Sequence, residues 1–315
     1  MTIPSIPPAA GTALQGLTVL QRGWLSSNNV VMHGHGLGAV VVDTGHVVHR
    51  EQTVDLLRLA LGSEALRTVV NTHLHSDHCG GNAAVQRAFE CRILVPPGNF
   101  AAARAWDEQA LSYLATGQMI ERFMPDTTLS PGDCLDVGGR RWQALAAPGH
   151  DPHSLMLYDS AHGVLISADA LWEDGFGVVF PELEGEQAFA QVAATLDLIE
   201  TLDVTWVLPG HGAPFQDTAS ALRRARERLC AFEADPARHA RYAMRVLLKY
   251  HMMETRQQTL QDLLDWVTTT PLYHCVWTRL DRPEGTLKDF GGRIVDALVA
   301  SGALRRKDHW VIDVG

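Results

Sequence analysis

Residues 71–82 read Asn-Thr-His-Leu-His-Ser-Asp-His-Cys-Gly-Gly-Asn, so three histidines and one aspartate fall within six positions. The apolar, β-branched residues before this run predict a strand over Thr68–His73 that leads into a polar loop. Imidazole and carboxylate groups suit zinc, iron or manganese, and a turn after a strand can direct them at a common point. The run therefore predicts a fold with a metal site at the end of a strand.

One histidine by itself would not support this prediction, because the chain has 15 and most histidines in proteins have structural roles. Four such groups packed together are different, since they would need compensating partners if they were buried without a metal. We therefore predict that His73, His75, Asp77 and His78 are metal ligands.

Strands and helices are predicted to alternate along residues 17–232, which is typical of a layered α/β fold. Early strands are predicted over Leu17–Leu20, Val30–Met32, Ala39–Val42 and Cys91–Val95, and later ones over Cys134–Val137, Trp142–Ala146, Leu155–Tyr158, Val164–Ser167 and Trp206–Leu208. Helices are predicted over His49–Leu61, Asn82–Phe89, Asn99–Ala115, Gln187–Leu202 and Gln216–Phe232.

The run at 71–82 resembles the signature motif of the metallo-β-lactamase superfamily, and the other motifs of that family occur in the same order. They are Asp43 in Val-Asp-Thr-Gly, His150 in Ala-Pro-Gly-His, Asp169 in Ser-Ala-Asp-Ala and His211 in Leu-Pro-Gly-His-Gly. Each lies at or beyond the end of a predicted strand. The resemblance extends from about Leu17 to Phe232. It implies the four-layer αβ/βα sandwich of that family.

Carried over residue by residue, the resemblance implies a dinuclear site for two Zn²⁺ ions, with iron or manganese as alternatives. The first ion would be bound by His73, His75 and His150, the second by Asp77, His78 and His211, with Asp169 as the bridging ligand. Asp43 would orient the ligand loop by hydrogen bonds. A metal-bound hydroxide would be the nucleophile of a hydrolytic reaction. Asp77 would be catalytic as well, by moving a proton to the leaving group.

The segment Ala234-Asp235-Pro236 predicts a boundary, because proline discourages a helix from continuing across it. We expect a catalytic domain over residues 1–235 and a small winged-helix-like domain over 236–315. Its elements would be helices over Arg238–Met253, Thr259–Thr268 and Leu287–Ser301, closed by two strands over Ala303–Arg306 and Trp310–Val314.

The fold leaves the substrate open, because many reactions share it. The first hypothesis is hydrolysis of a thioester, ester or lactone, since the net charge of −10 favours a small substrate over nucleic acid. The alternative is a phosphodiesterase or ribonuclease acting on RNA through the mildly basic end of the chain. β-Lactam hydrolysis ranks third. A fourth hypothesis, from another class, is a non-catalytic sensor with a DNA-binding tail.

The chain has no apolar run near the ~20 residues of a membrane helix, and its N-terminus lacks the pattern of an export signal. Its five cysteines are odd in number and unpaired in spacing. We therefore expect a soluble cytoplasmic protein with no membrane partner, and the oligomeric state, a homo-oligomer included, stays open. Four residues are candidates for the substrate wall, with packing or loop structure as the alternative: Trp106, Tyr113, His153 and Trp172.

Overall fold

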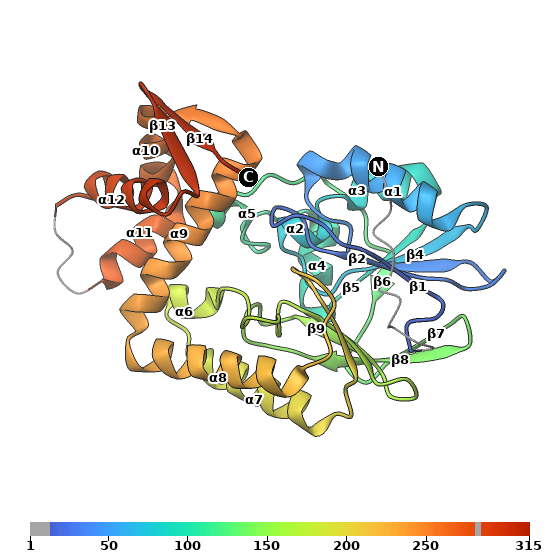
Figure 1. Cartoon of the computed structure of the whole chain (residues 1–315). Coiled ribbons are helices and arrows are strands. Elements are labelled where there is room, and N and C mark those ends of the chain that lie inside the picture. The colour runs from blue at the N-terminus through green and yellow to red at the C-terminus, as the bar shows by residue number, and fades with distance from the viewer. Residues whose placement is uncertain (1–12, 281–284) are drawn as a thin grey trace.

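The structure is a computed structural model that describes residues 13–280 and 285–315. Most of the N-terminal segment, for which the sequence predicts no export signal, lies outside the described residues. Residues 13–234 form two sheets that face each other, with helices on the outer side of each (Figure 1). This arrangement is the predicted four-layer αβ/βα sandwich.

The first sheet has six strands in sequential order. Its first three strands are antiparallel and its third to sixth strands are parallel, so the carboxyl ends of the third to fifth strands share one edge. The strands are β1 (Leu17–Leu20), β2 (Asn29–Met32), β3 (Ala39–Val42), β4 (Leu66–Val70), β5 (Arg92–Val95) and β6 (Thr127–Thr128).

An apolar layer joins the outer face of this sheet to α1 (Arg50–Leu61), α3 (Asn82–Phe89) and α4 (Pro97–Ala105). The helix predicted over His49–Leu61 is present as α1, and it buries Val54, Leu57 and Leu61. The predicted long helix over 99–115 is wrong. Trp106 adopts a left-handed backbone (φ 59°) that ends α4, and helix resumes only as α5 (Tyr113–Thr116).

The second sheet has five strands in the order β11-β10-β9-β8-β7, and only β10 and β11 are parallel. Its inner side packs on the first sheet, and its outer side is covered by two helices (Figure 1). The elements are β7 (Cys134–Val137), β8 (Arg140–Ala146), β9 (Leu155–Asp159), β10 (Val164–Ala168), β11 (Trp206–Pro209), α7 (Phe189–Thr201) and α8 (Thr218–Ala234).

The C-terminal region begins with the long helix α9 (Pro236–Thr255), whose first turn is capped by the side chain of Asp235. The remaining elements are β12 (Gln257–Thr259), α10 (Leu260–Thr269), α11 (Pro271–Arg279), α12 (Leu287–Ala300), β13 (Leu304–Lys307) and β14 (Trp310–Asp313). The strand β12 pairs with β14, so the sheet here has three strands where the sequence predicted two.

The apolar core of the C-terminal region includes residues from the preceding region. Val178 and Leu183, which lies in α6 (Phe180–Glu184), pack in the same cluster as Leu247 of α9. The boundary at residue 235 and the winged-helix interpretation stay predictions, since this shared core ties the two regions together. Over residues 13–280 and 285–315, no helix has the length and apolar character needed to span a bilayer.

Candidate metal centre

The predicted ligands lie in loops at the ends of strands from both sheets. Asp43 follows β3 directly, and the run at 71–82 follows β4 and contains the short helix α2 (Ser76–Cys79). Asp169 follows β10 and His211 lies just after β11, while His150 lies in the loop between β8 and β9. The edge where the two sheets meet therefore collects side chains that are far apart in the sequence.

The first group consists of His73, His75 and His150, whose ligand atoms lie within 4.8 Å of one another. His150 Nε2 is 2.8 Å from His75 Nδ1 and 3.3 Å from His73 Nε2. The other nitrogen of His150 donates a hydrogen bond of 2.5 Å to the carbonyl oxygen of Val178. That bond leaves Nε2 unprotonated and directed at the other two rings, as metal-binding histidines require.

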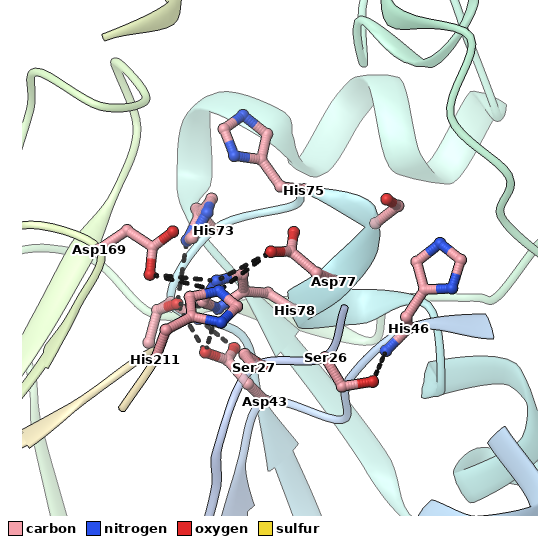
Figure 2. A network of polar contacts seen from close by, with 12 residues as sticks. Ser26, Ser27, Asp43, His46, His73, His75, Asp77, His78, Asp169 and His211 are labelled. Carbon is pink, nitrogen blue, oxygen red and sulfur yellow. Dashed lines mark hydrogen bonds and ion pairs between the residues drawn. The ribbon is translucent and has the colours of Figure 1, made fainter. Parts of the chain in front are cut away.

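The second group consists of Asp77, His78, Asp169 and His211, with ligand atoms again within 4.8 Å (Figure 2). His211 Nε2 lies 3.1 Å from Asp77 Oδ2. Asp169 Oδ1 lies 3.4 Å from His78 Nε2, and Asp169 Oδ2 lies 3.4 Å from Nε2 of His150 in the first group. Asp169 thus presents one oxygen to each group, which fits a bridging ligand. Ligation of a metal stays a prediction.

Asp43 is not a member of the second group, but it holds His78 of that group in position by a hydrogen bond. Its Oδ2 accepts a hydrogen bond of 2.8 Å from His78 Nδ1, and its two oxygens accept from the backbone N–H and hydroxyl of Thr72 at 2.9 and 2.8 Å. The Asp43 backbone is left-handed (φ 58°), a strained conformation for a residue with a side chain. This position directs His78 Nε2 toward Asp169 and fixes its tautomer.

Electrostatics also favours a cation. Burial is the main cause that holds the pKa of His73 well below its usual value, and burial lowers the pKa of His75 to about 4. Both rings are neutral near pH 7, which is the metal-binding form. Burial also acts to lower the pKa of His78, but the carboxylates of Asp169 and Asp43 outweigh it and raise that pKa well above its usual value. The second group therefore stabilises positive charge.

An unsatisfied atom gives a further test of whether the residues fit a metal. His78 Nε2 is fully buried and has no hydrogen-bond partner among the described residues. Burying a polar atom without a partner is unfavourable, and here the atom faces the carboxylates of Asp169 and Asp77. A divalent cation between these atoms would satisfy all three. The residues therefore fit a transition metal.

Gly210 allows β11 to approach Asp169 closely. A Cβ atom at this position would lie 2.2 Å from Asp169 Oδ1, closer than any real contact. This close approach explains why the residue before His211 in the motif is a glycine.

A cavity of about 860 Å³ opens onto both groups of ligands. One side is formed by the metal centre, with Trp24 and Trp172 beside it, and the opposite side by α9 and the end of α12. The C-terminal region thus forms one wall of the site. From α9, the lining residues are Tyr242, Arg245, Val246, Leu247, Lys249, Tyr250 and Met253.

Of the four candidates for the substrate wall, only Trp172 lines this cavity, and its indole N–H donates to Asp169 Oδ1 at 3.1 Å. Trp106 and Tyr113 pack in the core beneath the first sheet, where the Tyr113 hydroxyl donates to the Leu74 carbonyl at 2.8 Å. His153 is exposed on its loop, apart from the cavity lining.

Trp24 and Tyr250 are among the residues of the site that were not predicted. Trp24 stacks on His211, with ring centroids 5.5 Å apart and planes 8° from parallel. Tyr250 lies on α9 and bonds Ser76 at 2.9 Å, between two ligands of the signature loop. Neither belongs to a motif, so the sequence offered no signal for either one.

Comparison with known proteins agrees with this geometry. A family model described as the metallo-beta-lactamase superfamily matches residues 22–211, which is more than half of the chain and includes all seven predicted ligands. The chain belongs to the metallo-β-lactamase superfamily.

Curated proteins similar to this chain include a hydroxyacylglutathione hydrolase and an acyl-coenzyme A thioesterase. The hydroxyacylglutathione hydrolase of Dechloromonas aromatica (strain RCB) is 30% identical over 175 residues, covering 56% of this chain and 54% of the relative. The acyl-coenzyme A thioesterase MBLAC2 of Homo sapiens is 29% identical over 211 residues, covering 61% of this chain and 71% of the relative. The chain spans about half the length of the first curated relatives it matches.

Solved structures of metallo-β-lactamase proteins share the fold. A metallo-β-lactamase family protein from Thermus thermophilus has a TM-score of 0.55 and 22% identity, and the match covers 95% of this chain and 99% of that one. A protein from Burkholderia ambifaria, described as a beta-lactamase domain protein, has a TM-score of 0.54 and 22% identity, and the match covers 93% of this chain and 89% of that one. At these identities the likeness concerns the fold alone.

Proposed function

We propose that the protein is a dinuclear metal-dependent hydrolase that cleaves thioesters, with zinc as the expected metal and iron or manganese as alternatives. The observation that carries the proposal is the cavity that opens onto both ligand groups and has room for a small molecule. The names of the relatives support a thioester, because hydroxyacylglutathione and acyl-coenzyme A share that bond. Esters and lactones, which share the carbonyl group, are the next substrates to consider.

Each ligand group has a distinct place in the proposed reaction. His73, His75 and His150 would hold one metal, Asp77, His78 and His211 the other, and Asp169 would touch both. When bound, the metals supply Lewis-acid chemistry, because they lower the pKa of water toward neutrality and polarise a carbonyl oxygen.

Asp77 has a second role in the proposed reaction, which is proton transfer. Burial acts to raise the pKa of its carboxyl, but His78 and His211 outweigh burial and lower it to about 2. The carboxylate is therefore ionised near pH 7 and able to accept a proton. In thioester hydrolysis the oxygen of water bonds to the carbonyl carbon, the carbon–sulfur bond breaks, and one proton moves from water to sulfur. We assign that transfer to Asp77.

A substrate panel tests the proposal. The metal-loaded protein is assayed with a glutathione thioester, an acyl-coenzyme A thioester, a lactone, a phosphodiester and a chromogenic cephalosporin, and thiol release is followed with a thiol-reactive dye. We expect the thioesters to have the largest kcat/KM. Faster cleavage of the phosphodiester or the cephalosporin than of both thioesters would overturn the proposal.

A further inference from the structure

We propose that Tyr250 is a catalytic residue, contributed by the C-terminal helix α9, whose phenol donates a hydrogen bond to the carbonyl oxygen of the substrate. This inference rests on the proposed hydrolase function. It adds a residue that lies outside the matched family region, which ends at residue 211.

Position is the first argument. The Tyr250 hydroxyl lies 2.9 Å from the hydroxyl of Ser76, which stands between His75 and Asp77, one residue from each ligand group. Tyr250, His75 and Asp77 all line the same cavity. The phenol is thus held beside the short segment that carries His75 and Asp77, and Tyr250 lines the cavity that a substrate would enter.

The direction of the Ser76–Tyr250 hydrogen bond is the second argument. Ser76 is fully buried, and Tyr250 is the one partner of its hydroxyl among the described residues. If Tyr250 donated to Ser76, the serine hydrogen would be buried without an acceptor, which is unfavourable. The satisfied arrangement has Ser76 donating to the phenol oxygen. The hydrogen of Tyr250 is then free to be donated into the cavity.

The protonation state supports this role. Burial and the charge of Asp77 raise the pKa of Tyr250 well above its usual value. The phenol therefore keeps its hydrogen at neutral and mildly alkaline pH. A preorganised donor of this kind stabilises negative charge as it develops on a carbonyl oxygen during attack by water.

Helix α9 is held in place by contacts that do not involve the cavity. One turn beyond Tyr250, the carboxylate of Glu254 bonds His46 at 2.9 Å, and the Tyr250 ring packs edge-on against His46, with centroids 5.5 Å apart. His46 in turn follows Gly45, which pairs with Cys79 at the end of the signature loop. These contacts fix the phenol relative to the metal ligands.

The test is Tyr250→Phe in the full chain, loaded with zinc and compared with wild type on the substrate panel. We expect the zinc content to be unchanged, kcat to fall about 100- to 1,000-fold as for other lost oxyanion donors, and KM to change much less. The matched control is Tyr273→Phe, since Tyr273 is a buried tyrosine of the C-terminal region whose hydroxyl donates to the Met244 carbonyl at 3.0 Å. We expect this control to lower Tm and leave kcat unchanged.

A second variant, Ser76→Ala, separates catalysis from folding. It removes the group that orients the phenol, so kcat should fall less than in Tyr250→Phe, and the double variant should be no slower than Tyr250→Phe alone. Wild-type kcat in Tyr250→Phe, or a kcat loss that follows loss of zinc, overturns the proposal.

Failure of the proposed function has a different signature. If wild type cleaves a lactone or phosphodiester but no thioester, the thioester assignment fails, and Tyr250→Phe is judged by the same criteria on the active substrate. If wild type cleaves nothing in the panel, the hydrolase function and the role of Tyr250 fall together.

Discussion

His46 and Glu254 form a fully buried hydrogen-bonded pair, although they are 208 positions apart in the sequence. His46 Nδ1 accepts a hydrogen bond from the Val48 N–H at 3.2 Å, so the hydrogen of the neutral ring is on Nε2 and is donated to Glu254 Oε1. This pair joins the loop after β3, which carries Asp43, to the C-terminal helix α9. The pair therefore couples the stability of the metal centre to the C-terminal region.

Glu254→Ala should destabilise the protein by about 2 kcal/mol or more, because it leaves a buried N–H of His46 without an acceptor. Urea denaturation of wild type and variant measures the change. Glu233→Ala, which removes an exposed carboxylate of α8, is the control and should have little effect. Equal stability of the two variants would contradict the importance of the pair.

Metal analysis should find about two transition-metal ions per chain after reconstitution with zinc, because the side chains form two groups and Asp169 presents one oxygen to each. Elemental analysis of the purified protein, after removal of loosely bound metal, gives the stoichiometry. At most one ion per chain, with zinc, iron and manganese all tried, would contradict a dinuclear site.

Asp77→Asn should reduce kcat by about 100-fold or more, since the amide keeps the size of the side chain but cannot accept the proton. Much of the metal should remain, because the other ligands of both groups are intact. His73→Ala should instead lose metal first and activity as a consequence. Zinc content and turnover are measured on the same preparations. Near-normal turnover of the Asp77→Asn variant with both metals bound would exclude Asp77 as the proton carrier.

The free energy of unfolding should decrease as the pH is lowered from 6.5 to about 4, because of His239. Burial lowers the pKa of this residue from 6.5 to about 4 in the folded protein, and its Nε2 accepts from the Val179 N–H at 3.2 Å. Below pH 6.5 His239 binds a proton in the unfolded chain but not in the folded protein. This difference lowers the free energy of unfolding by up to about 3 kcal/mol.

His239→Gln keeps an acceptor but does not titrate, so the variant should lose this part of the pH dependence. Urea denaturation is repeated from pH 8 to pH 4 for wild type and variant. The difference between them removes effects common to both, such as metal loss. Parallel curves over this range would show that His239 does not cause the fall.

The family, and the residues that gather into the two side-chain groups, could be predicted from the sequence because they depend on short, local patterns. The run at 71–82 and the strands before Asp169 and His211 are contiguous, and the structure places them as predicted. The prediction from local patterns failed where one backbone angle decides whether a helix continues. At Trp106 a left-handed conformation ends the helix within a segment of good helix formers.

The rest of the site depends on contacts between distant segments, which no local pattern specifies. Nothing near Tyr250 in the sequence indicates that α9 lies against Ser76. Trp24 lies in the loop between β1 and β2, and the sequence does not indicate that it stacks on His211, 187 positions later. The role of the C-terminal region as a wall of the cavity could be seen only once the chain was folded.

The distance along the chain between His46 and Glu254 also has a consequence for biosynthesis. A ribosome adds about 5–20 residues per second, so Glu254 emerges about 10–40 s after its partner. The last predicted ligand, His211, emerges 43 residues before Glu254, so the full set of predicted ligands precedes its α9 partners by about 2–9 s. For those seconds the nascent chain would expose all seven predicted ligands before α9 covers them.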